Sequence, residues 1–420
     1  MPDRSVAPVY HSPGPFPFAH AVAHSFANGT KLHHLSAGRL PLLRLEFLSL
    51  AGSSFDPEPG IAHFTSRMLG EGSDSYNSAQ ISELFDSHGA HLEISPGFDF
   101  VNVTVYTPAR HLENLLSVLD DLLHRPAFPG VELETMRNIQ HQQLRLSLER
   151  TSFVASREFR RMLFGAEHPY GRLMEPEHIQ EMTSGKLAQF FSDRMERRYE
   201  MVLSGAVEDV HIESLGQYFG TLPIYEQLTP EMPAPAGEAG QIRIPMEGKV
   251  QSSIRMGGLA VGKAHPDYMG LLLLIEILGG YFGSRLMQNL REDKGYTYGV
   301  HASVNTMLGS AYILIGADVG SAHTEAAIEE IRKEIGILRT EPVSDDELQQ
   351  VRNYMKGTFL SGINSPFALA DKFKSVYLHG LGYNFYDRYF SEIDQTGADE
   401  LMDLARRYLD TDRMTVVIAG

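Results

Sequence analysis

The chain of 420 residues contains no cysteine and no tryptophan. Without cysteine it can form neither a disulfide nor a metal site with thiolate ligands. Basic residues are also scarce, because 36 Lys and Arg stand against 53 Asp and Glu, and the formal net charge is −17. Nucleic acid affinity comes mostly from Lys and Arg that neutralise phosphates. The composition therefore argues against a nucleic-acid-binding protein, while it permits basic peptides as partners.

Long hydrophobic runs are absent as well. The best apolar run, residues 269–278, contains Glu276 and is too short to span a bilayer. Residues 1–26 carry Pro, His and Ser and lack the apolar core of a signal peptide. We therefore expect a soluble, cytoplasmic protein that makes no membrane contact. A hydrophobic fraction of 43% is that of a globular chain, and its length suits two or more domains.

What the sequence does contain is an internal repeat. Residues 132–138 read Glu-Leu-Glu-Thr-Met-Arg-Asn and recur, 215 positions later, as the Glu-Leu-Gln-Gln-Val-Arg-Asn of residues 347–353. Residues 201–205 align with residues 416–420 at the same offset. A long, fixed offset indicates two duplicated domains and excludes a solenoid of short repeats.

Each half of the chain shows the same order of patterns. Residues 43–51 and 253–261 are expected to be opening strands, and residues 100–106 alternate as a later strand does. Apolar residues at helical spacing predict amphipathic helices over residues 112–123 and 328–338. Strands and helices that do not alternate strictly indicate an α+β sandwich.

The predicted organisation has four parts. An N-terminal arm covers residues 1–39, a first domain covers 40–225, and a second domain covers 241–420. Between the domains, residues 226–240 form a linker stiffened by three prolines.

One segment of the first half carries a recognisable motif in altered form. Residues 60–73 resemble the zinc-site helix of the M16 (pitrilysin-like) peptidases, in which an inverted motif reads His-x-x-Glu-His. Here the five residues from His63 to Arg67 read His-Phe-Thr-Ser-Arg. The resemblance covers nearly the whole chain. It implies two homologous α/β-sandwich domains that form a half-shell. In the family, two such half-shells enclose a chamber in which peptides are cut.

The same resemblance assigns the other positions of the metal site. In the family, two histidines and a distal glutamate bind zinc, and the glutamate of the motif is the general base. This chain has Ser66 at the base position, Arg67 at the second ligand and Gln143 at the distal one. Serine cannot take a proton from water near neutral pH, arginine stays protonated, and an amide is a poor zinc ligand. We therefore expect no metal in this chain.

Two interpretations of His63 follow. In the first it is a remaining polar residue packed in the domain interior. In the second it belongs to a rebuilt metal site, with His91, His141 or another of the 18 histidines. No such pair has a ligand spacing tied to a nearby carboxylate.

The second half keeps a different part of the family pattern. Residues 279–298 resemble the M16 C-terminal signature, in which an arginine and a tyrosine seven positions later face the zinc centre of the opposing domain. Arg291 and Tyr298 have this spacing. The resemblance implies that they hold the substrate backbone and stabilise the oxyanion. Both side chains suit that role, because a guanidinium and a phenol are hydrogen-bond donors. An arginine and a tyrosine at this spacing are also common in any α+β domain.

These observations predict a subunit without zinc in a two-chain peptidase. A zinc-bearing M16 paralogue would supply the metal and the base, and this chain would supply Arg291 and Tyr298 in trans for hydrolysis of peptides. The chain alone would then be inactive. The alternatives are a non-catalytic scaffold that binds peptides or assembles proteins, in the form of a homodimer for example, and a hydrolase that uses other metal ligands.

Overall fold

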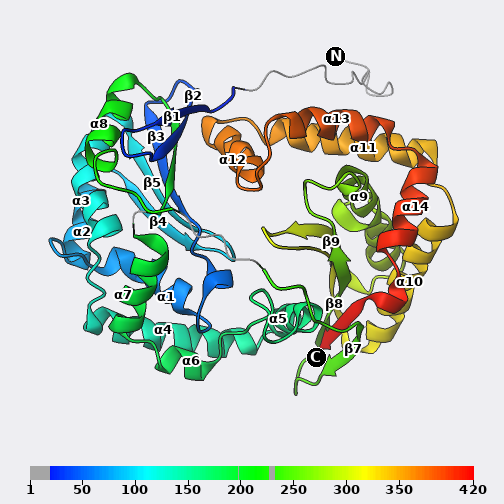
Figure 1. Ribbon diagram of the computed structural model, residues 1–420. Coiled ribbons are helices and arrows are strands. Elements are labelled where there is room, and N and C mark those ends of the chain that lie inside the picture. The colour runs from blue at the N-terminus through cyan, green and yellow to red at the C-terminus, as the bar shows by residue number, and fades with distance from the viewer. Residues whose placement is uncertain (1–18, 197, 227–231) are drawn as a thin grey trace, which may run out of the picture.

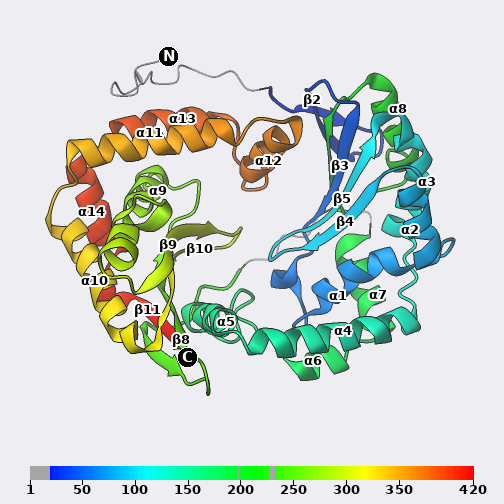
Figure 2. The same ribbon diagram turned by 180° about the vertical axis from the view of Figure 1, so that it is seen from behind.

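The computed structural model describes residues 19–196, 198–226 and 232–420. Two β-sheets lie on opposite sides of the molecule, and helices cover their outer faces (Figures 1 and 2). The chain has the two-domain α+β architecture expected from its sequence, curved into an open shell. Among the helices of the described residues, none combines the length and the apolar character needed to cross a bilayer.

The first sheet has six strands in the order β1-β2-β6-β3-β5-β4. They are β1 Val22–Ser25, β2 Lys31–Ser36, β3 Leu42–Ser49, β4 His91–Pro96, β5 Val101–Pro108 and β6 Glu200–Gly205. The second sheet has five strands in the order β7-β11-β8-β10-β9. They are β7 Gly240–Ile244, β8 Gln251–Ala260, β9 Thr297–Thr306, β10 Ala311–Gly320 and β11 Thr415–Ala419.

The two sheets share one plan, which agrees with the repeat in the sequence. The order β2-β6-β3-β5-β4 matches β7-β11-β8-β10-β9 strand for strand. In each sheet the first pair of this series is parallel, β2 with β6 and β7 with β11, and the other pairs are antiparallel. The expected strands 43–51, 100–106 and 253–261 correspond to β3, β5 and β8, with shifts of one or two residues at their ends.

Fourteen α-helices of the described residues complete the two halves. In the first half they are α1 Ile61–Met68, α2 Ser78–Ser87, α3 Leu112–His124, α4 Gly130–Leu148, α5 Thr151–Phe164, α6 Pro176–Gln180, α7 Ser184–Phe190 and α8 Asp209–Phe219. In the second half they are α9 Tyr268–Ile275, α10 Thr324–Thr340, α11 Asp345–Ser361, α12 Pro366–Tyr377, α13 Asn384–Gln395 and α14 Ala398–Tyr408. The expected helices 112–123 and 328–338 correspond to α3 and α10.

The predicted N-terminal arm needs correction. Residues 22–36, which we assigned to it, form β1 and β2 of the first sheet. Leu32 and Leu35 of β2 are buried, and β2 pairs in parallel with β6, a strand nearly 170 residues further along the chain. A pairing of that sequence separation leaves no local pattern to detect. Residues 1–18 of the arm and residues 227–231 of the predicted linker lie outside the described residues, and the other domain boundaries stay a prediction.

The two halves exchange a helix. The α5 helix of the first half packs on β8 and β11 of the second sheet, where Phe159 and Phe164 join Val417 in one buried cluster. The α12 helix of the second half packs on β2 and β6 of the first sheet, where Phe373 contacts Val202. Both helices lie on the inner faces of the sheets (Figure 2). Each half therefore completes the core of the other.

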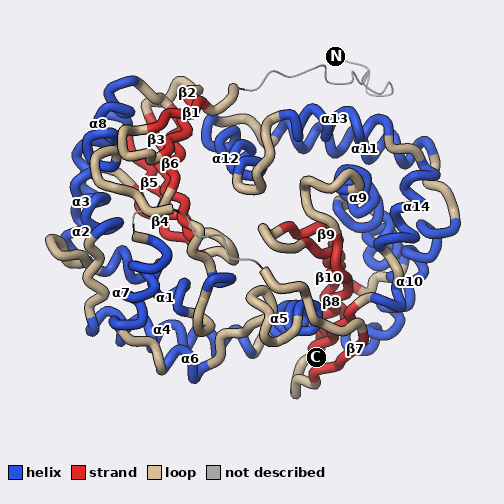
Figure 3. Tube along the Cα trace, in the orientation of Figure 1, coloured by secondary structure: helices blue, strands red, loops and turns tan. Residues whose placement is uncertain are grey.

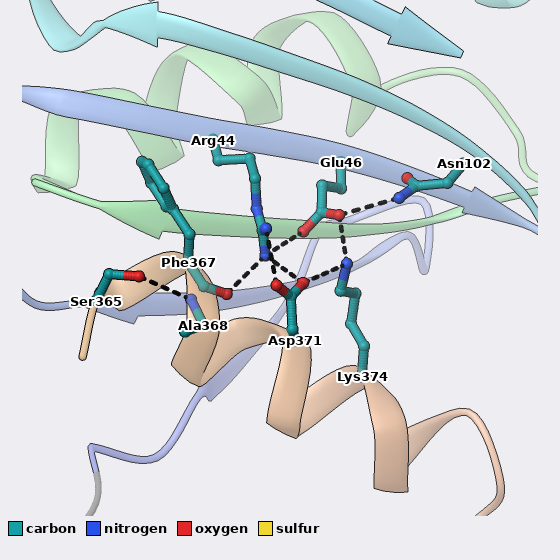
Figure 4. A network of polar contacts seen from close by, with 8 residues as sticks. All are labelled: Arg44, Glu46, Asn102, Ser365, Phe367, Ala368, Asp371 and Lys374. Atoms are coloured by element: carbon teal, nitrogen blue, oxygen red, sulfur yellow. Dashed lines mark hydrogen bonds and ion pairs between the residues drawn. The ribbon is translucent and has the colours of Figure 1, made fainter. Parts of the chain in front are cut away.

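Strand alternation explains why charged residues face these exchanged helices. Along β3, Leu43, Leu45 and Phe47 point into the apolar core, so Arg44 and Glu46 point to the opposite face. That face is covered by α12, and the guanidinium of Arg44 donates hydrogen bonds to Asp371 of this helix (Figure 4). The exchanged helices fix the positions of the two halves, and with them the candidate site residues.

Candidate functional site

The candidate metal positions of the first half lie on α1 and α4. The α1 helix begins after Gly60, whose φ of 102° is in the left-handed region. The carboxylate of Asp56 accepts hydrogen bonds from the backbone N–H groups of Gly60, at 2.8 Å, and Ala62, at 2.6 Å. Burial raises the pKa of Asp56 to about 7, against the effect of these two bonds. The start of the helix is thereby anchored, and it places His63, Ser66 and Arg67 on successive turns.

His63 is half-buried and uncharged near neutral pH. Burial lowers the pKa of its imidazole, the positive charge of Arg67 lowers it further, and a hydrogen bond with the side chain of Gln140 on α4 acts in the opposite direction. Its Nε2 atom has no hydrogen-bond partner among the residues that the structure describes. Of the candidate metal positions, His63 is the one that still offers a nitrogen atom able to bind a metal.

Ser66 is turned onto its own helix. It has no exposed surface. Its hydroxyl lies 2.7 Å from the carbonyl oxygen of Ala62 and 3.0 Å from that of His63, and it donates to these acceptors. The hydroxyl is committed to backbone acceptors, so this position has neither the chemistry nor the free space to activate a water molecule.

Arg67 and Gln143 line one cavity, although 76 residues separate them along the chain. The cavity has a volume of about 640 Å³ and lies between α1, α2, β4 and α4. Glu71 and Glu132 also line it. Burial raises the pKa of Glu71, and the nearby carboxylate of Glu132 raises it further. The fold thus brings together the helices that the sequence assigned to a metal site.

These side chains do not fit a zinc ion. Arg67 places a fixed positive charge beside the position of the metal, and Gln143 offers an amide in place of a carboxylate. Throughout residues 19–196, 198–226 and 232–420, no group of three or more His, Asp or Glu side chains is arranged to hold a metal ion. We therefore derive no catalytic step through zinc bound to this chain.

The second half presents Arg291 and Tyr298 near the start of β9. Arg291 belongs to a π-helical turn, Met287–Asp293, that packs against β9. Its guanidinium lies 4.7 Å from the centre of the Phe282 ring and 3.5 Å from the carboxylate of Glu292. Tyr298 is 90% exposed. Gly295 has a φ of 65° in the turn between them, which allows the chain to pass from the helical turn into the strand.

These side chains lie at the surface, whereas Ser66 of the first half is buried. Phe282 is itself 59% exposed, so the stacked arginine and phenylalanine rest at the surface. Tyr298 is therefore open to a ligand or to another protein, whereas 37% of the Arg291 side chain is exposed and its Nε faces the carboxylate of Glu292. Phe282 was missed as a site residue by the sequence analysis. It lies within the segment 279–298, and an aromatic ring near a candidate arginine is the signal that could have found it.

The comparison with known proteins decides the family. A profile described as "Insulinase (Peptidase family M16)" matches residues 50–164. A second profile, described as "Peptidase M16 inactive domain", matches residues 184–355. The chain belongs to the M16 peptidase family. The first matched region contains α1 and α4, and the second contains Arg291 and Tyr298 together with α7, β6 and α8 of the first half.

Relatives of M16 type carry two kinds of name. An "Uncharacterized zinc protease YmxG" from Bacillus subtilis (strain 168) is 22% identical over 366 residues, which cover 86% of this chain and 88% of the relative. A "Non-peptidase homolog YmxG" from Helicobacter pylori (strain ATCC 700392 / 26695) is 23% identical over 406 residues, which cover 90% of each protein.

Solved structures of other proteins share the fold. A peptidase M16 inactive domain from Pseudomonas fluorescens superposes with a TM-score of 0.86 at 22% identity, covering 95% of this chain and 98% of that chain. A protease from Helicobacter pylori superposes with a TM-score of 0.87 at 16% identity, covering 96% and 100%. At these identities the likeness concerns the architecture alone.

Proposed function

We propose that this chain is the non-zinc subunit of a two-chain M16 peptidase. A zinc-bearing M16 paralogue contributes the metal and the general base. This chain closes the chamber and presents Arg291 and Tyr298 to a peptide bound at the partner's metal. The substrates are peptides or unfolded segments small enough to enter, and we place the complex in the cytoplasm.

The observation that carries the proposal is an asymmetry between the halves. In the first half, a buried serine and an exposed arginine occupy positions where zinc chemistry needs a base and a ligand. In the second half, Tyr298 is exposed, and Arg291 lies at the surface, where it stacks on Phe282 and pairs with Glu292. The guanidinium has N–H groups beyond the one that faces Glu292, so these groups and the phenol of Tyr298 can donate to an acceptor from outside this chain.

The two side chains suit the stabilisation of negative charge. Attack on a peptide carbonyl places charge on its oxygen, and donors aimed at that oxygen lower the barrier by a few kcal/mol each, roughly. Arg291 offers a planar fork of N–H groups, and its stacking on Phe282 restricts the plane in which the fork lies. Tyr298 adds a phenolic O–H from the edge strand β9.

The edges of the two sheets support the binding of an extended peptide. Both β4 and β9 end their sheets, so each has one side without a partner strand among the described residues. His91, Leu92 and Ile94 of β4 line the cavity next to Arg67. Extended peptides add to such edges by main-chain hydrogen bonds.

The experiment uses the mixed complex. This chain is purified alone and with a zinc-bearing M16 paralogue from the same genome, and cleavage of a fluorogenic peptide is measured. We expect no activity from the chain alone. In the complex, Arg291→Ala combined with Tyr298→Phe should lower kcat about 100-fold or more, with a smaller change in KM. Arg332→Ala, at the surface of α10, is the matched control.

Full activity of the double variant in the mixed complex contradicts the proposed role. A second function has one specific observation in its favour, the name "Non-peptidase homolog" of the Helicobacter pylori relative. In that function the chain is a non-catalytic scaffold that binds peptides or assembles other proteins, as a homodimer for example. It predicts that the chain forms its physiological assembly without a zinc-bearing partner, which size-exclusion chromatography with light scattering measures.

A further inference from the structure

A second cavity lies in the other half of the molecule, away from the cavity beside Arg67. It has a volume of about 400 Å³ and is bounded by α9, α11, α12 and α13. Figure 3 shows α11 and α13 along the upper edge of the second half, α12 at one end of them and α9 below. A volume of this size is within the range of pockets that hold small ligands.

Aromatic rings form the walls of this cavity. Tyr268 comes from α9, Phe359 from α11, and Tyr386 and Tyr389 from α13. The ring of Phe359 packs against two of the others, with centroid distances of 5.3 Å to Tyr386 and 5.4 Å to Tyr389. Closely packed rings give a rigid apolar surface that needs little reorganisation to receive an apolar group.

Two lysines line the cavity, and they lie near enough for the charge of Lys372 to act on Lys263. Lys263, in the loop after β8, donates from Nζ to the carbonyl oxygen of Ser375 at 2.7 Å and to its hydroxyl at 2.9 Å. Lys372, on α12, places its Nζ 4.7 Å from the centre of the Phe359 ring. Hydrogen bonds and the ring contact hold both side chains towards the cavity. Each ammonium keeps donor capacity for a ligand, because a lysine has three N–H groups.

The two lysines lack a carboxylate of their own. Neither makes an ion pair with an acidic side chain of the described residues. Burial lowers the pKa of Lys372, and the charge of Asp371 opposes this only in part, since the oxygens of Asp371 form ion pairs with Arg44 and Lys374. In a chain of net charge −17, two neighbouring cations without a counter-charge are unexpected.

The surroundings of both lysines disfavour their charged forms. Burial lowers the pKa of Lys263 to about 8, and the positive charge of Lys372 contributes to this. Burial also lowers the pKa of Lys372. At pH 7 Lys263 remains mainly protonated, and an anion placed between the two lysines would relieve the repulsion and replace lost hydration.

Glu276 lies on the same cavity but away from the lysines. It begins a π-helical turn, Glu276–Gly280, and its carboxyl group packs over Gly280, where a Cβ atom would come within 2.4 Å of Oε2. Burial raises the pKa of Glu276, with no contribution from either lysine. The cavity therefore has two lysines, aromatic walls and a carboxyl group that lies away from the lysines. This carboxyl group can accept a hydrogen bond from an amide N–H.

We propose that this cavity binds the C-terminal residue of a peptide. Its carboxylate lies between Lys263 and Lys372, and its large apolar side chain packs among the aromatic rings. Glu276 accepts a hydrogen bond from a preceding amide. This site lies outside the proposed function, because it involves neither Arg291 nor Tyr298 and needs no partner chain.

Binding at this site would also act on α12. Lys372 and Ser375 face the cavity, whereas Asp371 and Lys374 of the same helix face the first sheet (Figure 4). A ligand held by Lys372 therefore stabilises the helix that joins the two halves. We expect the ligand to raise the thermal midpoint of the chain as well as to release heat on binding.

The test measures binding to the full chain by isothermal titration calorimetry. The probe is N-acetyl-glycyl-glycyl-phenylalanine with a free carboxylate, and its C-terminal amide is the matched ligand. We expect the acid to bind and the amide to bind about tenfold more weakly or worse. A probe ending in glycine should also bind more weakly, because it leaves the aromatic walls without a partner.

Variants assign the site. Lys263→Met and Lys372→Met should each weaken binding of the acid about tenfold, since the apolar stem stays and the charge goes. Lys333→Met, at an exposed position of α10, should leave it unchanged. Lys263→Arg keeps the charge and guards against loss of folding, which circular dichroism monitors. Equal binding of acid and amide, absence of binding, or equal binding by the lysine variants and the wild-type chain overturns the proposal.

Discussion

Replacing Glu46 with glutamine tests how the two halves are held together. The carboxylate of Glu46 lies on β3 with only 2% of its side chain exposed. It forms an ion pair with Arg44 at 3.0 Å and another with Lys374 of α12, and it accepts a hydrogen bond from Asn102 at 3.0 Å. Asp371 of α12 also pairs with both cations, but 55% of its side chain is exposed (Figure 4).

The structure sets the size of the effect. Removing one partner of a buried ion pair destabilises a protein by about 3–5 kcal/mol, because a buried charge is left uncompensated. Glutamine keeps the volume and one acceptor oxygen, and Asp371 still neutralises part of the positive charge. We therefore expect Glu46→Gln to lower the free energy of unfolding by about 3 kcal/mol, the lower end of that range.

Asp371→Asn is the matched comparison, because it removes one negative charge from the same network. Water already screens Asp371, so its loss should lower stability by about 1 kcal/mol or less. Urea unfolding is followed by far-UV circular dichroism and tyrosine fluorescence, since the chain has no tryptophan. Coincident transitions for the two signals justify a single free energy.

A smaller loss for Glu46→Gln than for Asp371→Asn would refute this reasoning, because burial would then not decide the strength of the network. A double-mutant cycle gives an independent check. Glu46→Gln and Lys374→Met should be coupled by about 0.5–3 kcal/mol, as contacting members of one network are. Additive effects would show that the contact in Figure 4 contributes nothing to stability.

Three further predictions follow. Burial alone would raise the pKa of Asp371, but hydrogen bonds and charge from Arg44 and Lys374 outweigh it and lower that pKa. The stabilisation from this carboxylate is therefore present above about pH 4 and is lost as the pH falls through its folded value. Asp371→Asn should flatten the dependence of the thermal midpoint on pH between roughly pH 5 and 2.5, and an unchanged slope contradicts this. Mass spectrometry of the metal should find no stoichiometric zinc in the isolated chain. The double variant Arg67→His with Gln143→Glu should bind zinc but should not gain hydrolysis. Stoichiometric metal in the wild-type chain would refute the expected metal-free state. Phe282→Ala removes the ring contact on Arg291. In the mixed complex this variant should lower kcat about threefold, which is less than the loss caused by Arg291→Ala. Equal losses of kcat would show that the ring does more than position the guanidinium.

Local periodicity made much of each half predictable. The alternation of apolar residues over 100–106 predicted β5, and the apolar spacing over 112–123 predicted α3. The repeat at an offset of 215 predicted the duplication, which the matching strand orders of the two sheets confirm. These signals were readable because the side-chain periods of strands and helices act between neighbours in the sequence.

Long-range pairing limited the rest of the prediction. The addition of β1 and β2 to the first sheet depends on a parallel contact with β6, and the exchange of α5 and α12 depends on faces of sheets in the opposite half. Neither leaves a periodic trace in the segment concerned. The linker and the domain boundaries were placed from composition, which carries no information on which half a helix covers.

The candidate site divides in the same way. The sequence alone determined that positions 66, 67 and 143 carry a hydroxyl, a guanidinium and an amide, and that decides which metal chemistry this chain can perform. Only the tertiary structure decided that Arg67 and Gln143 share a cavity and that Glu46 is buried under a helix of the other half. It also decided that Lys263 and Lys372 line one cavity without an ion pair to any carboxylate of the described residues. Residue chemistry is local, whereas burial and proximity arise from packing between segments far apart in the chain.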